Sequence, residues 1–92
     1  MRSLNKTSKF KKDFRRVSRT PQHRDIEFQL PAILNLLVTD SELPERYADH
    51  PLQGKRKGQR DCHIKPDLIL IYEKVGDDLL ILCELGSHSE IL

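Results

Sequence analysis

The chain has 92 residues, of which 37% are hydrophobic and 33% are charged. A chain of this length builds one modest core, so we expect residues 1–92 to form a single domain. No apolar run approaches the roughly 20 residues that cross a bilayer and no signal peptide is evident, so the sequence predicts a cytoplasmic protein with no membrane partner.

The formal net charge of +2 hides a strong segregation of charge along the chain. Residues 1–24 carry nine Lys or Arg and one acidic residue, and residues 54–66 carry five and one. Residues 25–53 and 67–92 each carry one basic and six acidic residues. Two basic blocks on a small domain indicate a polyanionic partner. A solvated basic helix face, or non-specific binding of RNA or DNA, is an alternative reading of the same pattern.

The first predicted elements are a short edge strand within residues 1–7 and a helix over residues 9–19. Phe10, Phe14 and Val17 recur at spacings of four and three, which gives one narrow apolar stripe on a basic helix. We expect Ser8 to cap this helix at its N-terminus.

A second helix is predicted to open at Asp25. Its apolar residues follow a clear 3.6-residue period; they are Ile26, Leu30, Ile33, Leu34 and Leu37. Pro31 falls inside the pattern and removes one backbone donor, so we expect either a kink or a late start of the helix.

Strands account for most of the second half of the chain. Residues 52–56 suggest a short strand, residues 60–65 alternate in polarity, and residues 67–73 and 79–85 are apolar on both faces, with a hairpin turn between them. The predicted order is β-α-α-β-β-β. This order indicates an α+β fold in which two N-terminal helices pack on an antiparallel sheet.

Titratable residues gather between residues 50 and 67, and the last histidine follows the final apolar run. If Lys74 faces Leu79 across the hairpin, Asp67 and His88 become diagonal neighbours on one sheet face, roughly 7–8 Å apart at the backbone. His63 lies on the preceding strand, close to Asp67 across a turn. The topology therefore predicts that side chains distant in sequence converge on one site.

Histidine beside aspartate suits proton transfer near neutral pH, because imidazole titrates there and a carboxylate can orient it or accept a proton. Basic side chains nearby can neutralise a phosphate; they are Lys55, Arg56, Lys57 and Arg60. This set fits RNA cleavage by attack of the ribose 2′-hydroxyl on the adjacent phosphate, which requires neither an external nucleophile nor a metal.

Two other readings of the histidines stay open on the residues alone. Each histidine taken singly is more often structural or surface-exposed than catalytic. A zinc site has suitable ligand chemistry, although the chain lacks the HxH or HExxH spacing of a strong zinc motif; its ligands would be His50, His63, Asp67 and His88.

Four segments, taken in order, resemble one known family. They are His50-Pro51-Leu52-Gln53-Gly54, Gly58-x-Arg60-Asp61-x-His63-x-x-Pro66-Asp67, Leu70-Ile71-Tyr72 and Gly86-Ser87-His88. Together they resemble the YafQ-type mRNA interferases, which are toxins of the RelE/ParE superfamily. The resemblance is specific from residue 47 onward and weak before residue 25.

The resemblance implies a RelE/ParE-like fold and a ribosome-dependent endoribonuclease of a type II toxin–antitoxin system. Such a toxin cuts mRNA in the ribosomal A site, beside the 16S rRNA, and so inhibits translation. A cognate antitoxin protein covers its basic surface, and the complex of the two can bind operator DNA. No cofactor or metal is expected.

The family's catalytic positions match His50, His63, Asp67 and His88. By this resemblance Asp67 is the base for the 2′-hydroxyl and His88 is the acid for the 5′-oxygen, while His50 and His63 orient the phosphate or share the proton relay. Two positions depart from the family pattern, because Leu68 and Leu92 stand where aromatic residues are common. Contact with substrate or ribosome is expected from the four basic residues named above and from these two leucines.

A second class of function remains possible on this fold. A helical hairpin on a sheet equally suits a non-enzymatic, ParE-like toxin that binds DNA gyrase or another macromolecule. In that case alanine at the three histidines His50, His63 and His88 would leave toxicity intact.

Overall fold

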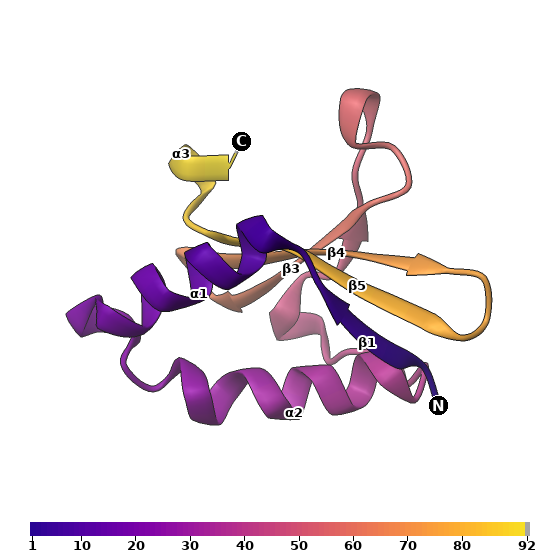
Figure 1. Cartoon of the computed structure of the whole chain (residues 1–92), viewed down its shortest axis with the longest axis horizontal. Helices are drawn as coiled ribbons and strands as arrows, with labels where there is room; N and C mark the ends of the chain where they lie inside the picture. The colour runs from indigo at the N-terminus through magenta and orange to yellow at the C-terminus, as the bar shows by residue number, and fades with distance from the viewer. Residues whose placement is uncertain (92) are drawn as a thin grey trace.

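The computed structural model describes residues 1–91 (Figure 1). Its elements in chain order are β1 (Ser3–Lys6), α1 (Ser8–Arg19), η1 (Pro21–His23), α2 (Ile26–Val38), η2 (Glu45–Tyr47), β2 (His50–Pro51), η3 (Gly54–Arg56), β3 (Arg60–Lys65), β4 (Leu68–Val75), β5 (Leu79–Gly86) and α3 (His88–Ile91). No helix among residues 1–91 has the length and apolar character needed to cross a membrane.

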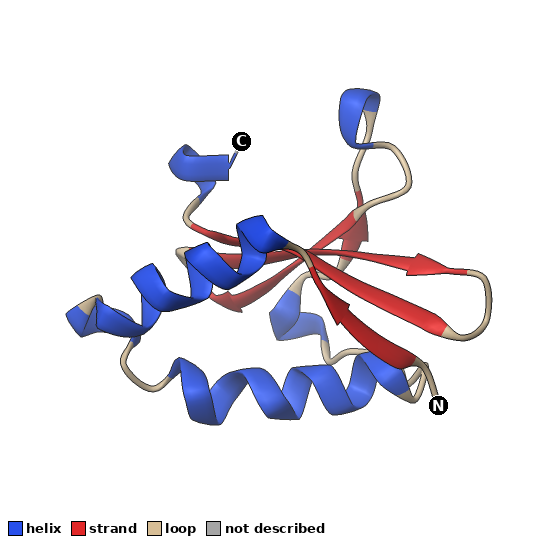
Figure 2. Ribbon diagram, viewed as in Figure 1, coloured by secondary structure: helices blue, strands red, loops and turns tan. Residues whose placement is uncertain are grey.

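The five strands form one sheet in the order β1-β5-β4-β3-β2 (Figure 2). β2, β3, β4 and β5 pair antiparallel, whereas β1 runs parallel to β5. The predicted α+β fold with two N-terminal helices on a sheet is confirmed. The sheet is mixed rather than purely antiparallel, because the exposed first strand docks beside β5 in the parallel direction.

The core lies between the two long helices and one face of the sheet. The helices contribute Phe10, Val17, Ile26, Leu30, Ile33 and Leu37, and the strands contribute Cys62, Ile64, Leu68, Leu70, Tyr72, Leu80, Leu82 and Leu85. Burying these apolar side chains is the main favourable term in folding. α3 and the loop around η3 lie on the side of the sheet away from α2 (Figure 1).

Both helices begin where the sequence indicates, with two local differences. Thr7, rather than Ser8, is the N-cap of α1: its Oγ1 accepts a hydrogen bond from the Phe10 amide and donates one to the Cys83 carbonyl. α2 begins at Ile26, so Pro31 lies inside the helix and does not delay its start.

The prediction of a strand over residues 52–56 is wrong. Pairing is confined to His50 and Pro51, and the chain then turns through η3. Gly54 and Gly58 have φ of +66° and +97°, which no strand accommodates. The loop between these two glycines therefore projects from the sheet and does not extend it.

The predicted hairpin register is also wrong. Val75, not Lys74, pairs with Leu79, and the register shifts once more between Ile71 and Tyr72. An irregularity of this kind puts an extra residue in one strand, which a count of residues cannot detect. β4 begins at Leu68, so Asp67 lies in the turn before the strand and not within the ladder.

Candidate active site

One face of the sheet carries the predicted histidines on its strands. Across the strands His50 pairs with Asp61, Asp61 with Ile71, and Ile71 with Glu84. A neighbouring row joins His63 to Ile69 and Ile69 to Gly86. Paired residues share a face, so these side chains form what we call the site face, which consists of His50, Asp61, His63, Ile69, Ile71 and Glu84.

The site face is covered in its middle and open at its rim. Ile69 and Ile71 are fully buried, although they point away from the core under the helices. The η3 loop and α3 lie on this side of the sheet (Figure 1). The middle of the site face, at Ile69 and Ile71, is therefore shielded from water.

His50 is held by two oxygen acceptors. Its Nδ1 lies 2.7 Å from the Ala48 carbonyl oxygen and 3.1 Å from Asp61 Oδ1. Asp61 is 1% exposed, and its Oδ1 has no hydrogen bond to any group among residues 1–91. Because a carbonyl oxygen can only accept, the contact with Ala48 assigns a proton to Nδ1, and Nε2 forms no hydrogen bond with any group among residues 1–91.

Asp61 was not among the site residues predicted from the sequence. The sequence pattern already placed Asp61 on the same face of a strand as His63, because the two residues are two positions apart. Its partner was not visible, because β2 is only two residues long and gives no periodic signal. A buried carboxylate beside an imidazole is a common way to orient a histidine for proton transfer.

Arg60 anchors the segment that leads into β2. Its Nε and Nη2 each lie 3.3 Å from a carboxylate oxygen of Asp49, and Tyr72 donates its hydroxyl hydrogen to the same carboxylate. Burial disfavours the charged guanidinium, but the bonds to Asp49 and Tyr72 outweigh it and raise the pKa of Arg60. Burial, followed by Asp49, raises the pKa of Tyr72. Arg60, predicted to contact substrate, thus has its guanidinium engaged within the protein.

His63 and His88 meet at the edge of the site face. Their ring centroids lie 5.0 Å apart with the ring planes at 71°, an edge-to-face arrangement. His63 comes from β3, and His88 is the first residue of α3. The structure therefore brings together two histidines that are 25 positions apart in the sequence.

Asp67 is exposed in the turn between β3 and β4. It lines a cavity of about 240 Å³ together with His23, Ser87 and Glu90. Asp67 is thus close to the start of α3, although not through the strand pairing predicted for it. Sequence reasoning reached the right neighbourhood by an incorrect register.

The remaining predicted contact residues fall into three groups. Lys55 and Lys57 are exposed on the loop after β2, whereas Arg56 between them is turned inward and bonds Glu84. Leu68 is 1% exposed within the core, so its side chain presents no surface to a ligand. The predicted role of Leu92 lies outside the described residues.

The basic block of the first helix forms a concave surface. A shallow cavity of about 410 Å³ is lined by Lys12, Arg15, Arg16 and Arg19. Lys12, Arg15 and Arg19 in this hollow favour binding of phosphate groups, whereas the guanidinium of Arg16 bonds Glu90 and the Leu85 carbonyl. No set of three or more His, Cys, Asp or Glu side chains within residues 1–91 is arranged to hold a metal ion.

Comparison with known proteins identifies the family to which this fold belongs. A family model described as "Bacterial toxin of type II toxin-antitoxin system, YafQ" matches residues 2–92. The mRNA interferase toxin YafQ of Escherichia coli K12 is 37% identical over 91 residues, which cover 98% of this chain and 95% of that protein.

Solved structures agree with the family model. A crystal structure of the Escherichia coli DinJ–YafQ complex contains a chain that matches with a TM-score of 0.85 at 36% identity, covering 100% of this chain and 99% of that one. A metal-bound toxin from Helicobacter pylori matches with a TM-score of 0.88 at 38% identity and covers 100% of both chains.

The fold and the match over nearly the whole chain define a bacterial toxin of the type II toxin–antitoxin class. The chain belongs to the YafQ family within that class. The resemblance drawn from the four sequence segments is thereby confirmed.

Proposed function

We propose that this protein is a ribosome-dependent endoribonuclease that cleaves mRNA in the ribosomal A site and so inhibits translation. The similarity to an mRNA interferase over 98% of the chain supports the enzyme class. The observation that carries the proposal is the edge-to-face pair of His63 and His88, together with an oriented His50 on the same sheet face as His63. Imidazoles so placed supply acid and base near neutral pH.

The reaction needs one proton acceptor and one proton donor. The 2′-oxygen bonds to phosphorus while the bond from phosphorus to the 5′-oxygen breaks, which leaves a 2′,3′-cyclic phosphate and a 5′-hydroxyl. Asp67 takes the proton of the 2′-hydroxyl, and the free Nε2 of His50 shares this role. His88 gives a proton to the departing 5′-oxygen, and His63 orients the phosphate.

Ribosome binding is assigned to the exposed basic side chains. Lys55 and Lys57 flank the site face, and the four-cation hollow on α1 lies on a separate element. Both suit the phosphates of rRNA, and neither selects a sequence. The same surfaces suit an acidic antitoxin; the DinJ–YafQ complex supports a cognate antitoxin as the protein partner.

The test is cleavage by the purified protein of one mRNA, either free or bound in programmed ribosomes, with the new 5′-ends mapped. We expect cleavage with ribosomes and little without them. His88→Ala is expected to keep the fold, as judged by circular dichroism, and to lose cleavage. Intact mRNA on ribosomes in the presence of folded wild-type protein would rule the function out.

Two further outcomes identify other classes. Growth arrest with a DNA-damage response, intact mRNA and no effect of the histidine substitutions would indicate a ParE-like toxin that acts on gyrase. Loss of cleavage on adding chelator, together with stoichiometric bound metal, would indicate a zinc hydrolase. Under the proposed mechanism a chelator that leaves the ribosomes intact has no effect on cleavage.

A further inference from the structure

α3 carries His88 but is too short to be stable alone. It has four residues, and isolated helices shorter than roughly 12–15 residues are marginal in water. Ser87 and Glu90 cap it reciprocally, because Glu90 Oε1 accepts the Ser87 amide at 2.8 Å and Ser87 Oγ accepts the Glu90 amide at 3.3 Å. A single capping box does not hold one turn of helix against a sheet, so contacts from other elements must do so.

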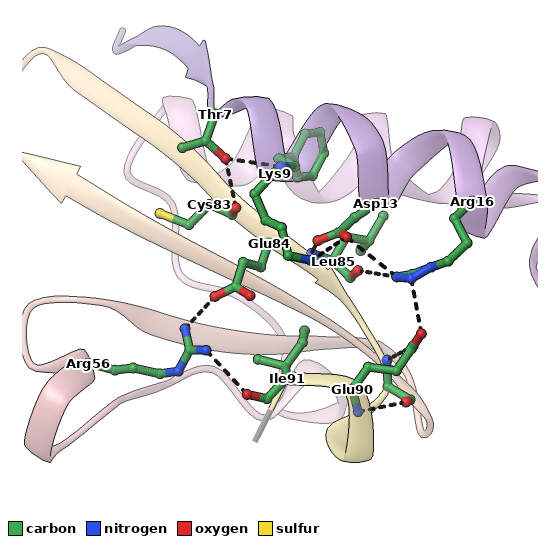
Figure 3. Close-up of polar contacts among 12 residues, drawn as sticks. Thr7, Lys9, Asp13, Arg16, Arg56, Cys83, Glu84, Leu85, Glu90 and Ile91 are labelled. Carbon is green, nitrogen blue, oxygen red and sulfur yellow. Dashed lines mark hydrogen bonds and ion pairs between the residues drawn. The ribbon is translucent and has the colours of Figure 1, made fainter.

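Two arginines from different parts of the chain supply those contacts (Figure 3). Arg16 of α1 donates to Glu90 Oε2 and to the Leu85 carbonyl, each at 3.0 Å, and so holds the start of α3. Arg56 of η3 donates to Glu84 Oε2 at 2.5 Å and to the Ile91 carbonyl at 3.2 Å. Its Nη1 also donates to Gln59 Oε1 at 3.2 Å.

We propose that Arg56 is a positioning residue that holds His88 in the site by joining three segments through one guanidinium: the η3 loop, β5 and the end of α3. The contacts of Arg56 with Glu84 and the Ile91 carbonyl are called the Arg56 clasp. The functional part of this inference rests on the proposed function, in which His88 is the proton donor.

The chemistry of the clasp requires arginine. The rigid fork of the guanidinium reaches two acceptors at once, whereas a lysine ammonium is a point charge on a flexible stem. A cation beside the last carbonyl of a helix also opposes the negative end of its dipole. The Arg56 side chain is 27% exposed and that of Glu84 is 19% exposed, so solvent screens this pair only partly.

The clasp also links substrate binding to catalysis. The loop that ends in Arg56 presents Lys55 and Lys57 outward, while Arg56 itself points inward to β5 and α3. Rigid attachment of the loop therefore fixes the distance between the cations that meet phosphate and the imidazole of His88. A displacement of about 1 Å in such a group can cost on the order of 100-fold in rate.

The variant Glu84→Ala distinguishes between two roles of Arg56: holding α3 through the clasp and contacting RNA directly. If Arg56 acts through the clasp, Arg56→Ala and Glu84→Ala both loosen α3. The readouts are hydrogen exchange at the Glu90 and Ile91 amides, both bonded to the Ser87 carbonyl, and the nuclear Overhauser effect between the rings of His63 and His88.

We expect exchange at these amides to accelerate about tenfold or more in both variants, and the ring contact to weaken. The double variant should show less than the sum of the two single effects. Arg56→Lys should give an exchange rate between those of the wild type and Arg56→Ala. If Arg56→Ala does not fold, Arg56→Lys takes its place in the test. Lys57→Ala, at the neighbouring exposed cation, should leave α3 exchange unchanged.

Kinetics on programmed ribosomes complete the test. The clasp predicts that kcat falls about 10- to 100-fold in both variants while KM changes less than about twofold. The proposal would be overturned if the α3 amides stayed protected in Glu84→Ala. It would also be overturned if Arg56→Ala raised KM and left kcat unchanged. Either result would make Arg56 an RNA contact. If the wild type cleaves nothing, the proposed function fails, whereas the exchange data still decide whether the clasp exists.

Discussion

At the scale of single residues, the most informative side chain is Asp61. It is buried, no Lys or Arg side chain among residues 1–91 forms an ion pair with it, and its Oδ1 lies 3.1 Å from Nδ1 of His50. A buried carboxylate without a compensating partner is costly, so such residues often serve a function. Here the carboxylate lies 3.1 Å from the Nδ1 whose proton His50 donates to the Ala48 carbonyl, and its negative charge favours the tautomer protonated on Nδ1.

We therefore expect Asp61→Asn to slow cleavage by about 10- to 100-fold, at or below the lower end of the 10²–10⁴-fold that general acid–base catalysis usually contributes. An asparagine amide can donate to Nδ1 and so favour the other tautomer of His50. The measurement is the single-turnover rate on programmed ribosomes. Asp77→Asn, at the exposed hairpin turn, is the matched control and should cleave normally. An unaltered rate in folded Asp61→Asn would remove His50 from the proton relay.

At the scale of elements, α3 depends on the ionisation of one of its own residues. The Ser87 amide, which donates to the carboxylate, lowers the pKa of Glu90 below its usual 4.5, and Arg16 acts in the same direction. A carboxyl whose pKa is lower in the folded state adds stability above its unfolded value, and this stability is lost as the pH falls through its folded value.

We expect the α3 amides to be protected at pH 6 and to exchange faster, after correction for intrinsic rates, as the pH falls below about 4.5. Glu90→Gln should remove most of this pH dependence, since the amide does not titrate. Hydrogen exchange at the α3 amides from pH 3 to pH 6, in the wild type and in Glu90→Gln, measures this pH dependence. A Glu90→Gln profile that still follows the wild type would mean that another group governs α3.

α2 offers a direct comparison of a buried and an exposed position on one helix. Ile33 is 1% exposed in the core, whereas Phe28 is 81% exposed. Ile33→Ala should lower the free energy of unfolding by about 2–5 kcal/mol through lost burial and a cavity. Phe28→Ala should change it by less than about 0.5 kcal/mol. Urea unfolding of both variants measures the two changes in the free energy of unfolding. Equal decreases in the two variants would show that the Phe28 side chain is buried in solution.

At the scale of the whole molecule, the basic hollow on α1 and the histidines of the candidate site lie on different elements. The cations of α1 lie around their own hollow, and the histidines lie on the strands and α3. Binding by the α1 cations can therefore be changed without altering the histidines, whereas the η3 loop ties its own cations to His88 through the Arg56 clasp. Under the proposed ribosome-dependent function, contacts to phosphates rather than to bases would let the protein bind ribosomes whatever mRNA they carry.

The double variant Lys12→Gln/Arg15→Gln should bind ribosomes more weakly and with less salt dependence. Each lost phosphate contact lowers the slope of log K against log salt by about 1, so we expect a decrease of about 2. Binding titrations from 50 to 300 mM KCl measure the slope. Arg24→Gln, in the turn between the helices, serves as the control. An equal decrease there would indicate a net-charge effect without a defined contact.

The sequence alone was sufficient for features that depend on near neighbours in the chain. The 3.6-residue period from Ile26 to Leu37 predicted α2, and the apolar runs before and after Gly76 predicted β4 and β5. The histidine segments also identified the family. These patterns can be read from the sequence because each depends only on residues within a single helix or strand, and not on the elements that pack against it.

Only the tertiary structure decided which distant side chains meet. The irregularity between Ile71 and Tyr72 changed the register, and a one-residue shift changes every pair beyond it. The two-residue β2 placed His50 against Asp61, and long-range arginine contacts hold a four-residue helix that no periodic pattern could reveal. The residue types of the site could therefore be read from the chain, whereas their pairing depended on contacts between strands and loops, which local sequence does not encode.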